Sequence, residues 1–217
     1  MQNFNKNVFI NCPFDEDYKQ ILSSIIFTTI ELGYIPRLSL ERADSGESRI
    51  SKIVSLINES KFGIHDLSRI ISSEENEHFR MNMPFELGID YGAKVLKDGQ
   101  WAEKKLLILE KERYRYQKSL SDLSGSDIKS HDNEPLKAVK AIRDWFVVTE
   151  DITAPSSNRI WTRFNEFNAY IYNLEVEIGG HNSLDDLQLP EIIRHIHEWI
   201  KSSSEAPVQE KDNDAAA

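Results

Sequence analysis

A glutamate near the start of a predicted helix is the residue best suited to chemistry. Glu86 lies in the segment Asn82-Met-Pro-Phe-Glu-Leu-Gly88. Pro84 favours the first helical position and disfavours helical geometry at Met83, which makes Glu86 the third helical residue. The helix dipole stabilises a negative charge there. Two interpretations stay open. In the first, the carboxylate only stabilises the helix, as in a capping box that lacks its hydroxyl partner. In the second, it is ionised and acts as a nucleophile or stabilises a cation, and it is then a poor general acid.

An aspartate at the end of an apolar run is the second candidate. Asp66 closes the run 62–66 and is followed by Leu67, Ser68 and Arg69. An aspartate in this position either caps the turn formed by the residues after it or offers hydrogen bonds to the hydroxyl groups of a sugar. The sequence leaves both roles open.

Other reactive side chains are assigned structural roles. Cys12 has no basic neighbour, which favours a small packing residue over a nucleophile. His65 lies within an apolar run, which is typical of a hydrogen-bonded core histidine. His195 and His197 are two positions apart on a predicted helix and therefore point in different directions. No metal site is expected.

These residues need a scaffold that brings them together. Apolar β-rich runs alternate with helical periods as far as residue 147, which predicts βαβ units and a parallel sheet. We predict a flavodoxin-like, five-stranded, mostly parallel sheet in the order 2-1-3-4-5 within a domain of residues 1–150. The strands are expected at 7–11, 34–40, 61–67, 105–110 and 127–130, and the helices at 18–32, 48–60, 84–96, 114–123 and 135–147.

Ligands of such sheets bind beyond the carboxyl ends of the strands, between strands one and three. The polar side chains that this rule gathers at one edge are Asn11, Asp15, Glu41, Arg49, Asp66, Ser68, Arg69, Asn82 and Glu86. The loop 72–80 leads into the helix of Glu86 and carries three glutamates without an apolar period. It is predicted to form a mobile lid over this cleft.

The strand–helix alternation stops after residue 148. Helices are expected at 156–178 and 189–200, which form a helical extension of residues 151–201, and residues 202–217 are expected to be a disordered tail. The extension is rich in aromatic side chains, which either cover the sheet domain or form an interface between copies of the chain. These side chains are Trp161, Phe164, Phe167, Tyr170 and Tyr172.

Composition narrows the classes of protein. The chain has 217 residues with 26 Lys and Arg against 36 Asp and Glu, a net charge of −10. This charge argues against direct binding of nucleic acid or of an anionic membrane. A single cysteine excludes an internal disulfide. Neither a signal-peptide pattern nor a long apolar run is seen, so a cytoplasmic protein is expected. Glycine-rich dinucleotide and triphosphate motifs are absent.

Three segments carry a family resemblance. Asn82-Met-Pro-Phe-Glu-Leu-Gly88 resembles the Asn-x-x-Phe/Tyr-Glu-Leu-Gly signature of TIR-like nucleotide-binding proteins and nucleoside 2-deoxyribosyltransferases. Ile64-His-Asp-Leu-Ser68 is similar to the end of the third strand in the transferases, and Val8-Phe-Ile-Asn-Cys-Pro-Phe14 to their first strand and loop. The resemblance covers residues 7–109. The loop at 12–15 and the helices after residue 156 depart from the pattern.

The resemblance implies N-glycosidic chemistry on a nucleotide or nucleoside, with NAD as a candidate substrate rather than a cofactor. It implies that Glu86 serves the anomeric carbon, that Asp66 binds ribose hydroxyls or orients the base, and that Arg49 or Arg69 holds a phosphate. It also implies a homo-oligomer. The leading hypothesis is a TIR-like enzyme that cleaves NAD or a related nucleotide, within a bacterial antiviral response. The alternatives are a deoxyribosyltransferase-like enzyme and a sensor or adaptor that binds a nucleotide signal without turnover.

Overall fold

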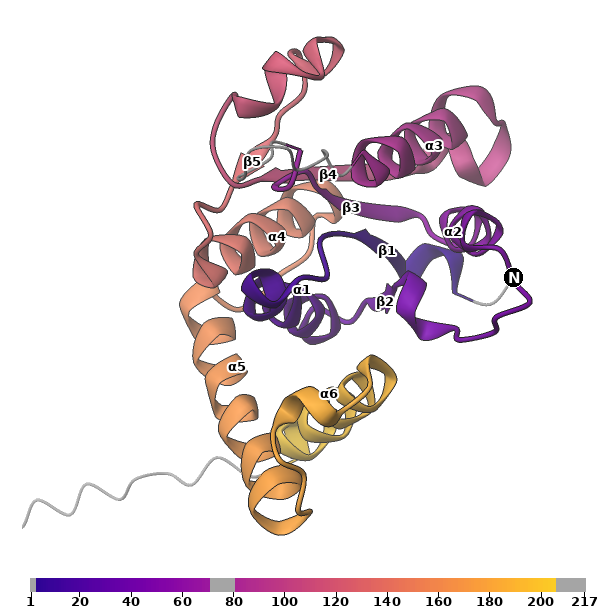
Figure 1. The fold of residues 1–217 in the computed structure, drawn as a ribbon. Helices are drawn as coiled ribbons and strands as arrows, with labels where there is room; N and C mark the ends of the chain where they lie inside the picture. The colour runs from indigo at the N-terminus through magenta and orange to yellow at the C-terminus, as the bar shows by residue number, and fades with distance from the viewer. Residues whose placement is uncertain (1–2, 71–80, 206–217) are drawn as a thin grey trace, which may run out of the picture.

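The structure is a computed structural model that describes residues 3–70 and 81–205. Its strands form one sheet in the order β2-β1-β3-β4-β5, and every neighbouring pair is parallel. The predicted fold class and strand order are confirmed, and the sheet lies between layers of helices (Figure 1). The strands are β1 (Asn7–Asn11), β2 (Ile35–Arg37), β3 (Phe62–Asp66), β4 (Lys105–Glu110) and β5 (Lys129–Ser130).

The two central strands, β1 and β3, are buried along their whole length. Such strands are covered on both faces and therefore read as near-continuous apolar runs. In the parallel register Val8 lies beside Phe62 and Asn11 beside His65. The polar residues that end these two strands therefore reach the same edge of the sheet.

Strand β2 is shorter than the predicted strand 34–40. Pro36 has no backbone N–H to donate, which confines it to an edge strand. After Leu38 the chain turns into a 3₁₀ helix at Ser39–Glu41. Glu41 consequently lies on this helix instead of following a strand directly.

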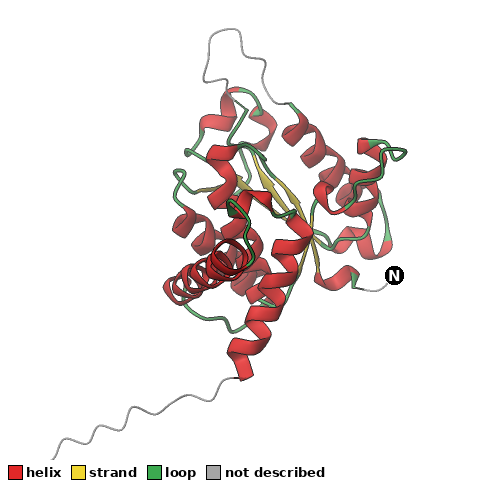
Figure 2. Ribbon diagram, turned by 60° about the horizontal axis from the view of Figure 1, so that its bottom comes forward, coloured by secondary structure: helices red, strands yellow, loops and turns green. Residues whose placement is uncertain are grey.

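Helices cover both faces of the sheet (Figure 2). α1 (Lys19–Glu31) and α4 (Pro135–Glu150) pack on the face that carries Val8 and Ile10. α2 (Arg49–Asn58) and α3 (Asn82–Leu96) pack on the opposite face, which carries Phe9. Neighbouring β1 residues point to opposite faces because side chains alternate along a strand.

The C-terminal helices α5 (Ser157–Tyr172) and α6 (Leu189–Glu205) join the main core. A stretch of π-helix, Asn173–Ile178, continues α5. The ring of Phe27 on α1 contacts the rings of Phe164, Phe167 and Trp199 at 5.5–5.9 Å between centroids. α6 runs through Glu205, so it includes four residues of the predicted disordered tail. Residues 206–217 lie outside the described part.

The aromatic side chains of α5 divide between the core and the surface. Phe164 and Phe167 are buried and Trp161 packs against them, whereas Tyr170 and Tyr172 remain exposed. Trp161, Phe164 and Phe167 therefore cover the sheet domain. These three residues do not support the alternative of an interface between copies of the chain.

The remaining elements are short. The predicted helix 114–123 forms two 3₁₀ helices because Tyr114 adopts a left-handed conformation and Leu120 leaves helical geometry. These two are Arg115–Lys118 and Ser121–Leu123, and, besides Ser39–Glu41, the other 3₁₀ helices are Phe4–Lys6, Glu16–Tyr18, Gly99–Glu103 and Leu184–Asp186.

The predicted lid 72–80 lies outside the described residues. Among the described residues, no helix is long and apolar enough to cross a membrane.

Candidate functional site

The first residue after β1 lies among three of the predicted site carboxyls. Cys12 is buried, and burial raises the pKa of its thiol well above its usual value. The negative charges of Asp66, Glu86 and Asp15 raise this pKa further. A thiol with a raised pKa stays protonated and is a poor nucleophile, which supports the packing role predicted for Cys12. Asp66 ends β3, and Asp15 pairs with Arg69 in the turn that follows this strand, so these two carboxyls lie at the carboxyl end of the sheet.

Glu86 lies deeper in its helix than the sequence predicted. α3 begins at Asn82, so Glu86 is the fifth helical residue and not the third. The expected start at Pro84 was wrong, because a proline is tolerated anywhere in the first turn, where backbone N–H groups have no helical partner. The Glu86 side chain is nearly buried, and its Oε1 accepts a hydrogen bond from Nη2 of Arg49 at 3.2 Å. Arg49 itself is half exposed.

The pKa of Glu86 lies above its ordinary value. Burial raises this pKa and outweighs the hydrogen bond and positive charge of Arg49 and the smaller effect of His65. One of the two interpretations that the sequence left open was a functional carboxylate that the helix dipole keeps ionised. That effect falls off within the first turn, and Glu86 is past it. The site therefore holds a desolvated carboxyl whose charge depends on Arg49.

A buried chain of polar groups fixes the start of α3 to the sheet. Nδ2 of Asn11 donates to the carbonyl of Met83 at 2.9 Å and lies 3.1 Å from Nδ1 of His65. Nε2 of His65 lies 3.0 Å from Oδ2 of Asp90, whose Oδ1 pairs with Nζ of Lys104 at 3.0 Å. Both ring nitrogens of His65 have partners, so the predicted hydrogen-bonded core histidine is confirmed.

Gly63 allows α3 to come this close to β3. A β-carbon at this position would lie 2.4 Å from Oδ2 of Asp90 and 2.8 Å from Nε2 of His65. Both distances are far below ordinary contact, so a larger residue would displace the pair. The glycine is therefore needed for the packing that places Glu86.

Asp66 is enclosed by donors from three parts of the chain. Its carboxylate accepts hydrogen bonds from the Tyr18 hydroxyl at 2.5 Å and the Ser68 backbone N–H at 2.8 Å, and lies 2.9 Å from Nε2 of His131. Burial alone would raise the pKa of Asp66, but these bonds and the charge of His131 outweigh burial and lower it. The structure shows the turn-capping role that the sequence had left open.

The sequence patterns did not identify His131 as a residue of the site. It directly follows β5, is fully buried, and also lies 3.0 Å from the Ser68 hydroxyl. The strand-end rule that selected Asn11 and Asp66 applies to it equally, but β5 is only two residues long and gave a weak signal.

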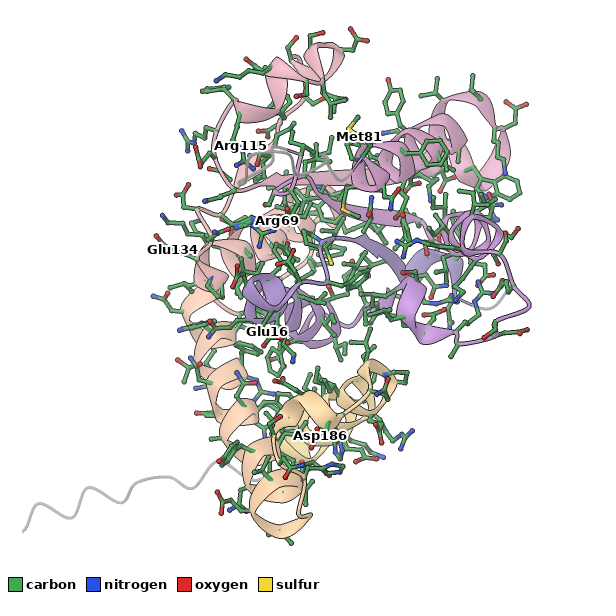
Figure 3. The ribbon with its side chains drawn as sticks, in the orientation of Figure 1. Glu16, Arg69, Met81, Arg115, Glu134 and Asp186 are labelled. Carbon is green, nitrogen blue, oxygen red and sulfur yellow. The ribbon has the colours of Figure 1, made fainter. Side chains whose placement is uncertain are left out.

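The remaining predicted residues fall into separate places. Arg69 binds Asp15 through two hydrogen bonds of 2.7 and 3.0 Å. Arg69 and Arg115 lie at the same end of the sheet (Figure 3), where Arg115 donates to the carbonyl of Ser68. Asn82 begins α3 and is exposed. Glu41 binds Arg37 at 2.8 Å and contacts none of the other predicted site residues.

No protein-family model and no curated protein matches the chain. Within the described ranges, no group of three or more histidine, cysteine and acidic side chains is placed to hold a metal ion. Among the described residues, the geometry of Glu86 and the sequence around it point most directly to a function.

Proposed function

We propose that the chain is a TIR-like enzyme that cleaves the N-glycosidic bond of NAD or a related nucleotide. The position of Glu86 carries the proposal. This nearly buried carboxyl lies at the carboxyl end of the central strands and contacts a half-exposed arginine. The resemblance of the segment 82–88 to the TIR-like signature supports the choice of reaction.

The reaction suits a desolvated carboxylate. The bond between C1′ of the ribose and the base nitrogen breaks, and its electron pair leaves with the base. Positive charge develops on the ribose, and a carboxylate shielded from water stabilises this charge more strongly than a solvated one. Nicotinamide leaves NAD as a neutral molecule, so its departure needs no acid. Water then bonds to C1′ and gives a proton to Glu86.

Arg49 is the cation best placed to meet a phosphate. Its exposed side chain contacts Glu86 through one nitrogen, and a phosphate makes strong, often bidentate bonds with a guanidinium. Arg69 already forms such a pair with Asp15. A phosphate bound by the other guanidinium nitrogens of Arg49 leaves the contact between Nη2 and Glu86 in place, so the carboxylate stays charged and faces the developing sugar cation.

Asp66 is a positioning residue in this proposal. Its carboxylate is buried and already engaged by three side-chain or backbone donors, so it has no free surface for a sugar hydroxyl. It holds the turn after β3, which carries Ser68 and Arg69. This role replaces the binding of ribose hydroxyls or of the base that the resemblance implied for Asp66.

The test is incubation of the full chain with NAD and with a panel of nucleosides and nucleotides, followed by chromatography. Release of nicotinamide is the expected result. Exchange of bases between nucleosides would instead indicate a deoxyribosyltransferase. Binding without any product would indicate a sensor, and neither binding nor product would overturn the proposal.

A further inference from the structure

Helix α3 differs from an ordinary surface helix, because its acidic side chains face inward and its apolar side chains face solvent. Its acidic residues, Glu86 and Asp90, face inward and are buried. The side that faces solvent is apolar, and its large side chains are 54% exposed (Tyr91) to 85% exposed (Leu96). We call this surface the α3 stripe. It consists of Met81, Phe85, Gly88, Tyr91, Gly92, Val95 and Leu96.

The α3 stripe is large enough for a stable interface. Its five large side chains expose roughly 600 Å² if a fully exposed one presents about 200 Å². The largest apolar patch of a typical monomer measures about 300–600 Å² and often marks a binding surface. Each partner in a stable complex buries about 800 Å², so the stripe alone supplies most of that area.

Two glycines one turn apart, Gly88 and Gly92, flatten the middle of the stripe. Neither has a positive φ, and a β-carbon on Gly88 would meet no atom within 4 Å. Glycine in a helix interior costs about 1 kcal/mol relative to alanine, and the fold of one chain gives no reason for that cost here. A second helix that crosses closely at this point would supply the reason.

We propose that the α3 stripe binds the same stripe of a second copy of this chain. The two helices cross antiparallel, with the glycines at the crossing. Phe85 precedes the glycines by one turn, and Leu96 follows them by one turn. An antiparallel pair therefore places Phe85 against Leu96 of the partner subunit, twice, as twofold symmetry requires. Figure 3 shows Met81, at the start of the stripe, on the side of α3 away from β3.

The charge distribution fits this occupant. Two chains of net charge −10 repel each other, so their contact requires a surface without charge. Within 81–96 the exposed residues include none that is charged. Because salt screens the repulsion between the rest of the two chains, the dimer is tighter at high salt. Glu86 faces the opposite side of α3, so this proposal stands or falls independently of the proposed reaction.

Sedimentation equilibrium of the full chain tests the proposal. The wild type is expected to have twice the 25.1 kDa mass of one chain at micromolar concentration. Phe85→Glu places an unpaired charge in the contact and is expected to weaken the dimer at least about a hundredfold. Gly88→Leu fills the crossing point and is expected to weaken it about tenfold or more. Because both positions are exposed, the two substitutions are expected to leave the monomer folded, which circular dichroism checks.

Tyr170→Asp on α5 is the matched control, because this residue is also an exposed large side chain but lies on a helix that packs on α1, on the other face of the sheet. It is expected to leave the dimer intact. A monomeric wild type would overturn the proposal. So would a Phe85→Glu variant that remains a dimer, or dissociation by Tyr170→Asp alone.

Discussion

At the end of β3, the carboxylate of Asp66 is surrounded by donors from Tyr18, Ser68 and His131. Asp66→Asn removes the charge and leaves part of this buried set unpaired. Breaking one partner of a buried charged network costs about 3–5 kcal/mol. Urea unfolding is therefore expected to show a loss of this size. Asp127→Asn, which removes an exposed partner of Lys129, should cost less than about 1 kcal/mol.

Asp66 also makes stability depend on pH with a definite sign. Its pKa is lowered in the folded state, so its stabilisation is fully present above the unfolded value of about 3.9 and is lost as pH falls through the folded pKa. Wild type should therefore lose stability more steeply than Asp66→Asn as the pH falls below about 4. Equal slopes for the two proteins would contradict the network.

Strand ends and the segment around Glu86 were the two patterns from which residues of the site could be predicted. Asn11 and Asp66 end long apolar runs, and the structure brings both to one edge of the sheet. The pairing of Arg49 with Glu86 could not be predicted, because it depends on the positions of α2 and α3 relative to each other on the sheet. His131 lies 65 residues from Asp66, and its strand is too short to show a pattern.

At the scale of elements, the approach of α3 to β3 depends on Gly63. Gly63→Ala brings a β-carbon within 2.4 Å of Asp90, so the helix or the strand must shift. Overpacking of this kind costs about 1–3 kcal/mol. Gly125→Ala is the matched control, because a β-carbon there meets open space. Thermal unfolding should show a clear loss for the first variant and almost none for the second; equal losses would refute the role of Gly63.

The order and direction of the strands followed from the sequence because apolar runs and helical periods alternate regularly. The boundaries were less predictable. Pro84 suggested a helix start two residues too late, since proline is compatible with any position in the first turn. The segment 114–123 has a helical composition but is interrupted by the backbone conformations of Tyr114 and Leu120.

At the scale of the whole molecule, the C-terminal helices share the core of the sheet domain. Phe167 packs against Phe27 and Trp199, so Phe167→Ala should cost about 3–5 kcal/mol. Tyr170→Ala, on the exposed side of the same helix, should change stability by less than about 1 kcal/mol. Denaturant unfolding is expected to be one transition for the wild type; a separate early transition of α5 and α6 would contradict a shared core.

The sequence predicted these helices but described them as an extension. The absence of strand patterns after residue 148 marks the end of the sheet. This absence does not indicate which elements the C-terminal helices cover. Both helices pack on α1, whose buried residue Phe27 lies more than 130 positions earlier in the chain. Such a contact follows from packing and leaves no local pattern.

In the proposed reaction, the Glu86 carboxylate stabilises the positive charge that develops on the ribose. Glu86→Gln keeps the shape and removes the charge. Loss of such a transition-state contact costs about 3 kcal/mol or more, which lowers turnover at least about 10²-fold. Affinity for the substrate should change little, because the sugar cation has not formed in the bound substrate. Folding stability should change by less than about 1 kcal/mol, since Arg49 is half exposed and stays hydrated.

The most direct measurement is the rate of nicotinamide release from NAD by wild type, Glu86→Gln and Glu41→Gln, with binding and melting temperature recorded on the same samples. Glu41 is the matched control because it pairs with Arg37, away from Glu86. The proposed mechanism predicts activity in wild type and Glu41→Gln and its loss in a folded, ligand-binding Glu86→Gln. An active Glu86→Gln variant would contradict it.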